Sequence, residues 1–130
     1  MLSTVVIFGE AERGRFHMPL ALNSLEEVYR SLGNPPSDSN GIYFAIQTML
    51  YDHRLIYFRV EEEGYNIKDY MVGFQLLKEG RAIQNVDAIG LPGVGSNEII
   101  DSATLLSHKL HCLLLTREKD LYDYLTEAVY

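Results

Sequence analysis

The chain lacks three features that would each point to a particular class of protein. Cysteine occurs once, at Cys112, so no disulfide can form within the chain, and a lone thiol fits a cytoplasmic protein. No apolar run approaches the roughly 18 residues that a membrane span needs, so we expect no membrane partner. Basic residues are few: 11 Lys and Arg against 18 Asp and Glu give a net charge of −7, which argues against a nucleic-acid partner.

The apolar residues that are present alternate between two periodicities. Segments rich in β-branched and aromatic residues predict four strands at Thr4–Phe8, Arg54–Val60, Val86–Gly90 and His111–Leu115. Helical spacing predicts five helices: one from Ser24 to Gly33, then Ile42–Asp52, Ile67–Glu79 and Asn97–Lys109, and a last one capped by Thr116. This alternation predicts one α/β domain over residues 1–130, with three layers, a mostly parallel sheet of about four strands and helices on both faces.

Several local details follow from the same patterns. Ser24 and Glu27 have the spacing of a capping box. The first helix is expected to bury the stripe formed by Leu25, Val28, Tyr29 and Leu32. Three of the strands are nearly continuous in apolar residues, which predicts burial on both sides. Most of the nine tyrosines are expected in the core, with Tyr122 and Tyr130 exposed.

Two glycine-rich turns resemble anion-binding loops only in part. Gly9–Gly14 has the spacing of a phosphate loop, but Arg15 and Phe16 follow where that loop requires Lys and Ser or Thr. The second turn, Gly90–Gly95, precedes a helix, but its glycines are not spaced as in a dinucleotide site, and Pro92 has no N–H to donate. We therefore expect both to be structural turns and predict no cofactor, with a bound anion at the second turn as the weaker alternative.

Candidate metal ligands and catalytic groups are sparse. His108, His111 and Cys112 are close in sequence but are expected in different elements, and no second cluster completes a zinc site. Glu10, Glu118 and Asp120 follow predicted strands, at the edge where open α/β sheets bind ligands. Converging carboxylates there could hold magnesium, as in PIN-like nucleases, although the first strand lacks the aspartate of those enzymes. We predict no catalytic residue and no metal ligand.

Three segments carry a further pattern in a fixed order. The first is a strand followed by Gly-x-Ala-x-Arg-Gly, a proline and a Ser-led helix, and its residues are Gly9, Ala11, Arg13, Gly14, Pro19, Ser24 and Gly33. The second is a helix feeding a strand that ends in Arg59-Val60, and the third is a strand with the turn Pro92-Gly93-Val94. In this combination, residues from about Val5 to Leu115 resemble the core domain of contractile phage tail sheath proteins.

The resemblance implies a non-enzymatic structural protein that acts through subunit contacts in a ring or helical stack, or with a longer tail-type partner. Such a protein would be cytoplasmic during assembly and then part of a virion or a phage-like injection machine. Sheath proteins are far longer, with inserted domains where this chain has only Glu61–Asn85, and with terminal arms that add strands to neighbouring subunits. This chain is expected to lack both arms and to be a minimal sheath-like subunit or an assembly accessory.

We place the subunit contacts on two segments. They are the Gly9–Pro19 turn, with Glu10, Arg13, Arg15 and Phe16, and the acidic loop Glu61–Tyr65, with Glu61, Glu62, Glu63 and Tyr65. The three consecutive glutamates are expected to be solvated. The alternative function is a small ligand-binding domain or a magnesium-dependent hydrolytic domain that uses the strand ends, through Glu10, Ser96, Glu118 and Asp120.

Overall fold

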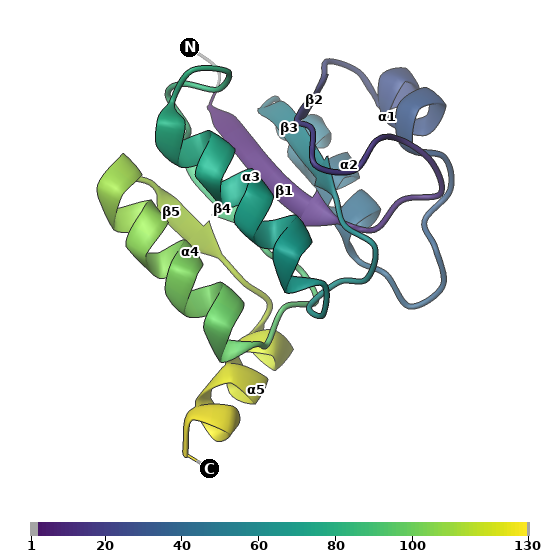
Figure 1. Ribbon diagram of the computed structural model, residues 1–130. Coiled ribbons are helices and arrows are strands. Elements are labelled where there is room, and N and C mark those ends of the chain that lie inside the picture. The colour runs from purple at the N-terminus through teal and green to yellow at the C-terminus, as the bar shows by residue number, and fades with distance from the viewer. Residues whose placement is uncertain (1–2, 130) are drawn as a thin grey trace.

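A computed structural model describes residues 3–129, and the side chains of residues 3–126. The elements in chain order are β1 (Thr4–Gly9), β2 (Leu20–Leu22), α1 (Leu25–Leu32), α2 (Gly41–Leu50), β3 (Arg54–Arg59), α3 (Ile67–Glu79), β4 (Ala88–Gly90), α4 (Asn97–Leu110), β5 (Leu113–Leu115) and α5 (Glu118–Val129). The predicted α/β class is confirmed, and the strands form one sheet between helical layers (Figure 1).

The sheet has the strand order β2-β3-β1-β4-β5, in which β3, β1, β4 and β5 are parallel. Short β2 was not predicted, because three residues show no measurable period. It pairs antiparallel with β3, placing Leu22 opposite Leu55. The chain passes from β1 to β3 on one side and then returns to β4 on the other. The carboxyl ends of β1 and β4 therefore flank a switch point, where open α/β sheets leave a crevice.

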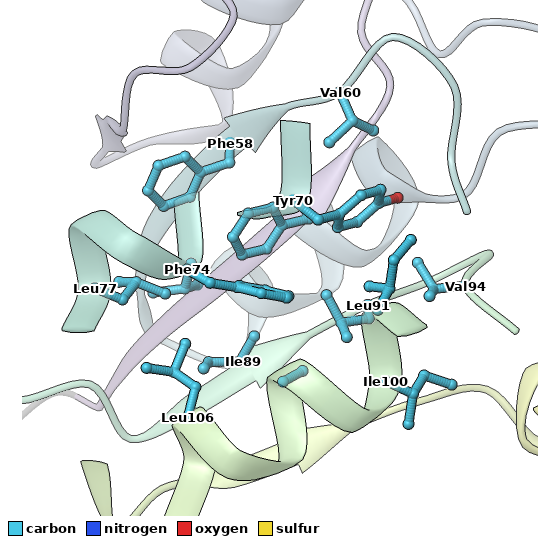
Figure 2. Packing of buried hydrophobic residues seen from close by; sticks show 14 of the residues in the cluster. Phe58, Val60, Tyr70, Phe74, Leu77, Ile89, Leu91, Val94, Ile100 and Leu106 are labelled. Atoms are coloured by element: carbon cyan, nitrogen blue, oxygen red, sulfur yellow. The ribbon is translucent and has the colours of Figure 1, made fainter. Parts of the chain in front are cut away.

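One face of the sheet is covered by α3 and α4, and it holds the larger core (Figure 1). Phe8 of β1 is fully buried and stacks on Phe58 at 4.7 Å and on Tyr70 at 5.6 Å between ring centroids. Figure 2 shows Tyr70 and Phe74 of α3 lying between the strands and α4. Gly73 lets α3 approach this closely, since a Cβ there would collide with the Phe8 ring.

The opposite face is covered by α1 and α2 over β1 and β3, with Val28, Ile42 and Tyr57 in its core. This cover does not extend over β5, where Leu113 is 67% and Leu115 is 41% exposed. The fourth predicted strand is therefore not buried on both sides. An apolar strand at a sheet edge needs a helix on each face to be buried, and only the face of α3 and α4 supplies one.

The local capping signals were predicted with mixed success. The Glu27 N–H donates to Ser24 Oγ at 3.2 Å and the Glu27 carboxylate accepts from the Asn23 N–H at 2.7 Å, so the capping arrangement is confirmed with a shift of one residue. Thr116 does not cap the last helix, because α5 begins at Glu118 and Arg117 precedes it. The side chain of Arg117 instead forms hydrogen bonds with Asp120 and Asn40.

The burial predicted for the first helix and for the tyrosines is partly wrong. Val28 and Leu32 are buried, whereas Leu25 is 46% and Tyr29 is 60% exposed. Among the tyrosines whose side chains the structure describes, only Tyr57 and Tyr70 are fully buried; the strongly exposed ones are Tyr29, Tyr43, Tyr51, Tyr65 and Tyr122. Exposure of Tyr122 is confirmed, and Tyr130 lies outside the described residues. Within residues 3–129, no helix has the length and apolar character needed to cross a membrane.

Candidate functional site

The carboxyl ends of the parallel strands surround a polar cleft of about 590 Å³. It is lined by the residue after β1, the loop before α2, the loop after β3, the turn after β4 and the residue before α5. This is the edge at which the sequence placed Glu10 and Asp120. The predicted contact loop Glu61–Tyr65 forms one wall of the cleft.

Glu63 is the central group of this cleft. It is only 6% exposed, and its carboxylate accepts hydrogen bonds from the backbone N–H groups of Glu10, Asn40 and Gly41, each at 2.9 Å. Two of these donors lie at the N-terminus of α2, where free N–H groups favour an anion. The Glu63 carboxylate thus occupies an anion-binding nest formed by its own chain. The prediction of a solvated glutamate run is wrong for Glu63.

Glycines make this arrangement possible by letting backbones approach. A Cβ on Gly9 would lie 2.6 Å from the Cα of Gly41, and a Cβ on Gly41 would lie equally close to Gly9. Gly93 has a φ of 80°, and a Cβ there would lie 2.8 Å from Glu63 Oε1. Gly9 of the first turn and Gly93 of the second therefore serve close packing around Glu63, which agrees with the predicted structural role of these turns.

Glu10 and two buried tyrosines complete this side of the cleft. The Glu63 N–H donates to Glu10 Oε2 at 3.0 Å, so the two glutamates bind each other's backbone. Tyr57 donates its hydroxyl to the Glu10 carbonyl at 2.8 Å, and the Gly64 N–H donates to the Tyr70 hydroxyl at 2.8 Å. Burial raises the pKa of both tyrosines well above 10, and nearby Glu63 raises each further.

Arg117 and Asp120 form a second polar unit on the other side. Arg117 donates two bonds to the Asp120 carboxylate, both at 2.8 Å, and a third to Asn40 Oδ1 at 3.0 Å. Asp120, which is 3% exposed, also accepts from the Gly93 N–H at 2.8 Å. The hydrogen bond to Asp120 raises the pKa of the Arg117 guanidinium above its ordinary value. Asn40 touches both units, since its backbone N–H donates to Glu63 and its side-chain oxygen Oδ1 accepts from Arg117.

Few of the carboxylates at the strand ends are available to bind a ligand or a metal ion. Glu10, Glu63 and Asp120 each accept hydrogen bonds from their own chain. In the described part of the chain, no three His, Cys, Asp or Glu side chains are grouped so that they could share a metal ion. Glu118 is exposed in the first turn of α5, and Ser96 occupies the N-cap position of α4 without a side-chain cap bond.

The structure brings the two predicted contact segments side by side. Phe16 forms a bridge with Arg59, whose guanidinium lies 4.3 Å from the centroid of the Phe16 ring. His17 binds Asp69 at 2.5 Å, and the Glu61 N–H donates to the other Asp69 oxygen at 2.9 Å. The turn after β1 and the loop after β3 thus form one continuous surface.

The accessibility of the predicted contact residues differs from one to the next. Arg13 and Arg15 are exposed, and Arg13 donates to the Tyr29 carbonyl at 3.0 Å. Glu61 and Glu62 are exposed, Tyr65 is 74% exposed and Phe16 is 39% exposed. Glu10 is half-buried, and Glu63 is too buried for its side chain to reach a partner.

Sequence reasoning missed Asn40, Tyr57 and Arg117, which connect the two polar units. Asn40 was part of a polar loop, Tyr57 of an apolar strand, and Arg117 of an expected helix start. The only sequence signal was the position of Arg117 directly after a strand. Comparison of the chain with protein-family models, with curated proteins and with solved structures finds no match.

Proposed function

We propose that this chain is a non-enzymatic structural or assembly protein, similar to a minimal contractile tail sheath subunit, that acts through subunit contacts. In this role it forms a ring or helical stack, or joins a longer tail-type partner. It would assemble in the cytoplasm and end in a virion or a phage-like particle. The proposal rests on the ordered sequence resemblance together with the geometry of the strand-end cleft.

The observation that carries the proposal is the use of Glu63. A carboxylate of the chain itself fills the N–H nest at the start of α2, the place where an open α/β sheet would hold a ligand anion. The Asp120 carboxylate likewise accepts hydrogen bonds from Arg117 and from the Gly93 N–H. These bonds hold the loops after β1, β3 and β4 in one fixed surface, which suits docking more than chemistry.

The exposed side chains support the same proposal. Phe16, Met18 and Tyr65, which lie on the two contact segments, are 39%, 49% and 74% exposed. Aromatic residues and methionine are enriched at protein interfaces. Arg13 and Arg15 on the turn and Glu61 and Glu62 on the loop add charges of opposite sign to one surface, which can pair between symmetric copies.

The experiment is light scattering over a concentration series, with electron microscopy of the largest species. We expect mass to rise with concentration and rings or tubes to be visible. Phe16→Asp and Tyr65→Asp should weaken association at least tenfold, while Tyr51→Asp, at a 76% exposed site on α2's end, should not. A strict monomer at every concentration would contradict self-assembly, and equal effects of all three variants would contradict the placement.

A second candidate, a ligand-binding domain, is favoured by the size of the cleft and by the third hydrogen bond of Arg117 lying at its wall. A ligand that binds only the folded chain raises its melting temperature. Magnesium, nucleotides and inorganic phosphate therefore form the panel. A dose-dependent shift that Arg117→Gln abolishes would favour this candidate over the structural one, and an unchanged melting temperature would favour the structural one.

A further inference from the structure

The sheet has an uncovered apolar strip at its β5 edge. Leu113 pairs with Ala88, which belongs to the core under α1 and α2, and Leu115 points to the same face. Leu114 pairs with Ile89 and packs on the opposite face. Because α2 packs mainly on β1 and β3, nothing of that layer buries Leu113 and Leu115, which are 67% and 41% exposed.

Helix α5 carries the matching unpartnered surface. Leu121 and Leu125 are one helical turn apart on the same side, and they are 45% and 54% exposed. Between them Tyr124 packs against the larger core, and its hydroxyl donates to Asp101 of α4 at 2.7 Å. In Figure 1, α5 starts at the carboxyl end of β5 and runs away from the sheet.

The start of α5 is held in this direction by the second polar unit. In a repeating strand–helix unit, the helix after a strand packs back on the sheet. Here only Thr116 and Arg117 separate β5 from α5, and Asp120 in the first turn is bound by Arg117 and by the Gly93 N–H. Swinging α5 over its own β5 would remove Asp120 from these bonds and expose it.

We propose that α5 of a second copy of this chain covers the strip formed by Leu113 and Leu115, in a reciprocal exchange. Each chain carries one apolar helix side and one apolar strip, so two copies leave neither exposed. Exchange of an identical element is a low-cost route to a dimer, and a two-fold interface makes each contact twice. The inference rests on the self-association in the proposed function and names a different surface for it.

The first test uses single cysteines, with Cys112→Ser as the common background. One chain carries Leu113→Cys and another, with a different tag, carries Leu125→Cys, so every disulfide between tags joins two molecules. We expect mild oxidation to link the two tags. The matched control pairs Leu113→Cys with Leu105→Cys, an equally exposed leucine on α4 at 74%, and should give at least tenfold less product.

The second test measures dimer mass by light scattering. Leu113→Asp and the double variant Leu121→Asp, Leu125→Asp should each weaken dimerisation at least tenfold, while Leu105→Asp should leave it unchanged. All of these side chains are exposed, so circular dichroism should show the fold retained. A chain that carries Leu113→Cys and Leu125→Cys together should oxidise to a covalent dimer.

Three results separate this inference from the proposed function. If that double-cysteine chain closes its disulfide within a monomer, α5 covers its own sheet and the exchange is wrong. If larger particles form and neither aspartate variant changes them, the exchange is wrong while assembly stands. If the linked dimer forms and no larger species appears with rising concentration, the exchange holds and the ring or stack is wrong.

Discussion

The two faces of the sheet are built in different ways. On the face of α3 and α4, aromatic rings fill the space, with Phe8 in contact with Phe58, Tyr70 and Phe74. On the face of α1 and α2, the core ends at Ala88 of β4, and the leucines of β5 are exposed. There α2 is attached at its N-terminus by a buried carboxylate, Glu63, in addition to its packing.

The difference teaches that helices on one sheet can depend on different interactions. α3 contributes three buried side chains, Tyr70, Phe74 and Leu77, to a continuous apolar core. α2 is apolar at most positions of its sequence GIYFAIQTML, yet Tyr43 and Leu50 on it are 58% and 64% exposed. A polar anchor at one end and an exposed apolar side therefore distinguish α2 from α3.

The largest effect is expected from a substitution in the aromatic core on the face of α3 and α4. Phe8→Ala should lower the free energy of unfolding by about 3–5 kcal/mol, because it leaves a cavity among three rings. Chemical denaturation measures the loss. Phe16→Ala, at a 39% exposed site, is the control and should cost about 1 kcal/mol or less. Similar costs at the two sites would mean that this core is not the main source of stability.

The next effect removes the polar anchor of α2. Glu63→Ala leaves three backbone N–H groups without their acceptor and should cost about 2–4 kcal/mol. Hydrogen exchange should show the first turn of α2 losing protection before α3 does. Its exposed neighbour is the control, since Glu62→Ala should stay within about 0.5 kcal/mol of the parent. An unchanged stability in Glu63→Ala would show that packing alone holds α2.

A smaller effect appears at high pH, with one tyrosine on each face. Burial raises the pKa of Tyr57 and of Tyr70 in the folded state, while in the unfolded state it stays near the ordinary value of about 10. The neutral hydroxyls thus stabilise the fold fully below pH 10, and this contribution is lost as pH rises above it. Each tyrosine should contribute a slope of up to about 1.4 kcal/mol per pH unit.

Denaturation at pH 9, 10 and 11 measures that slope for the parent and for two variants. Tyr57→Phe and Tyr70→Phe should each make the fall with pH shallower, whatever they cost at neutral pH. Tyr43→Phe, on the exposed side of α2, is the control and should leave the slope unchanged. A parent stability that does not fall between pH 9 and 11 would contradict the raised pKa values.

The smallest expected effect is that of Leu113→Ala, which we compare with the same substitution of a leucine on the other face. Leu113→Ala should shift the stability of the dilute chain by no more than about 0.5 kcal/mol, because the side chain is 67% exposed. Leu106→Ala, at a 6% exposed site on α4, should cost about 2–5 kcal/mol. If a second copy covers β5, the loss of stability caused by Leu113→Ala should grow with protein concentration. If Leu113→Ala and Leu106→Ala destabilised the dilute chain equally, the proposed difference between the two faces would be wrong.

Local signals were the most predictable part of the fold. The bounds of α3 were predicted to the residue, and Gly80 ends it in a left-handed conformation with a φ of 68°. The start of α1 after Ser24 and the start of α4 at Asn97 were also predicted. These features depend on residues within one turn of each other, so a short window contains their cause. The short strand β2 was missed because its partners in β3 lie far along the chain: Leu20 pairs with Tyr57 and Leu22 with Leu55, which are 37 and 33 residues away.

The candidate site was predictable only as a location. Strand carboxyl ends follow from the α/β pattern, and Glu10 and Asp120 were placed there correctly. The burial of Glu63 was not, because it arises from backbone donors at Glu10 and at Asn40 and Gly41, which are 53, 23 and 22 residues away. The hydrogen bond that Asp120 accepts from the Gly93 N–H was not predicted either, because it spans 27 residues.

The sequence by itself determined the alternation of strands and helices, the turns that glycine and proline permit, and a net charge of −7. These depend on residue type and on neighbours along the chain. Only the tertiary structure decided which polar groups form hydrogen bonds within the chain, which tyrosines are buried, and that Leu113 and Leu121 are exposed. Burial depends on which element packs over a residue, and the direction in which α5 leaves the sheet is set by contacts between Asp120, Arg117 and Gly93.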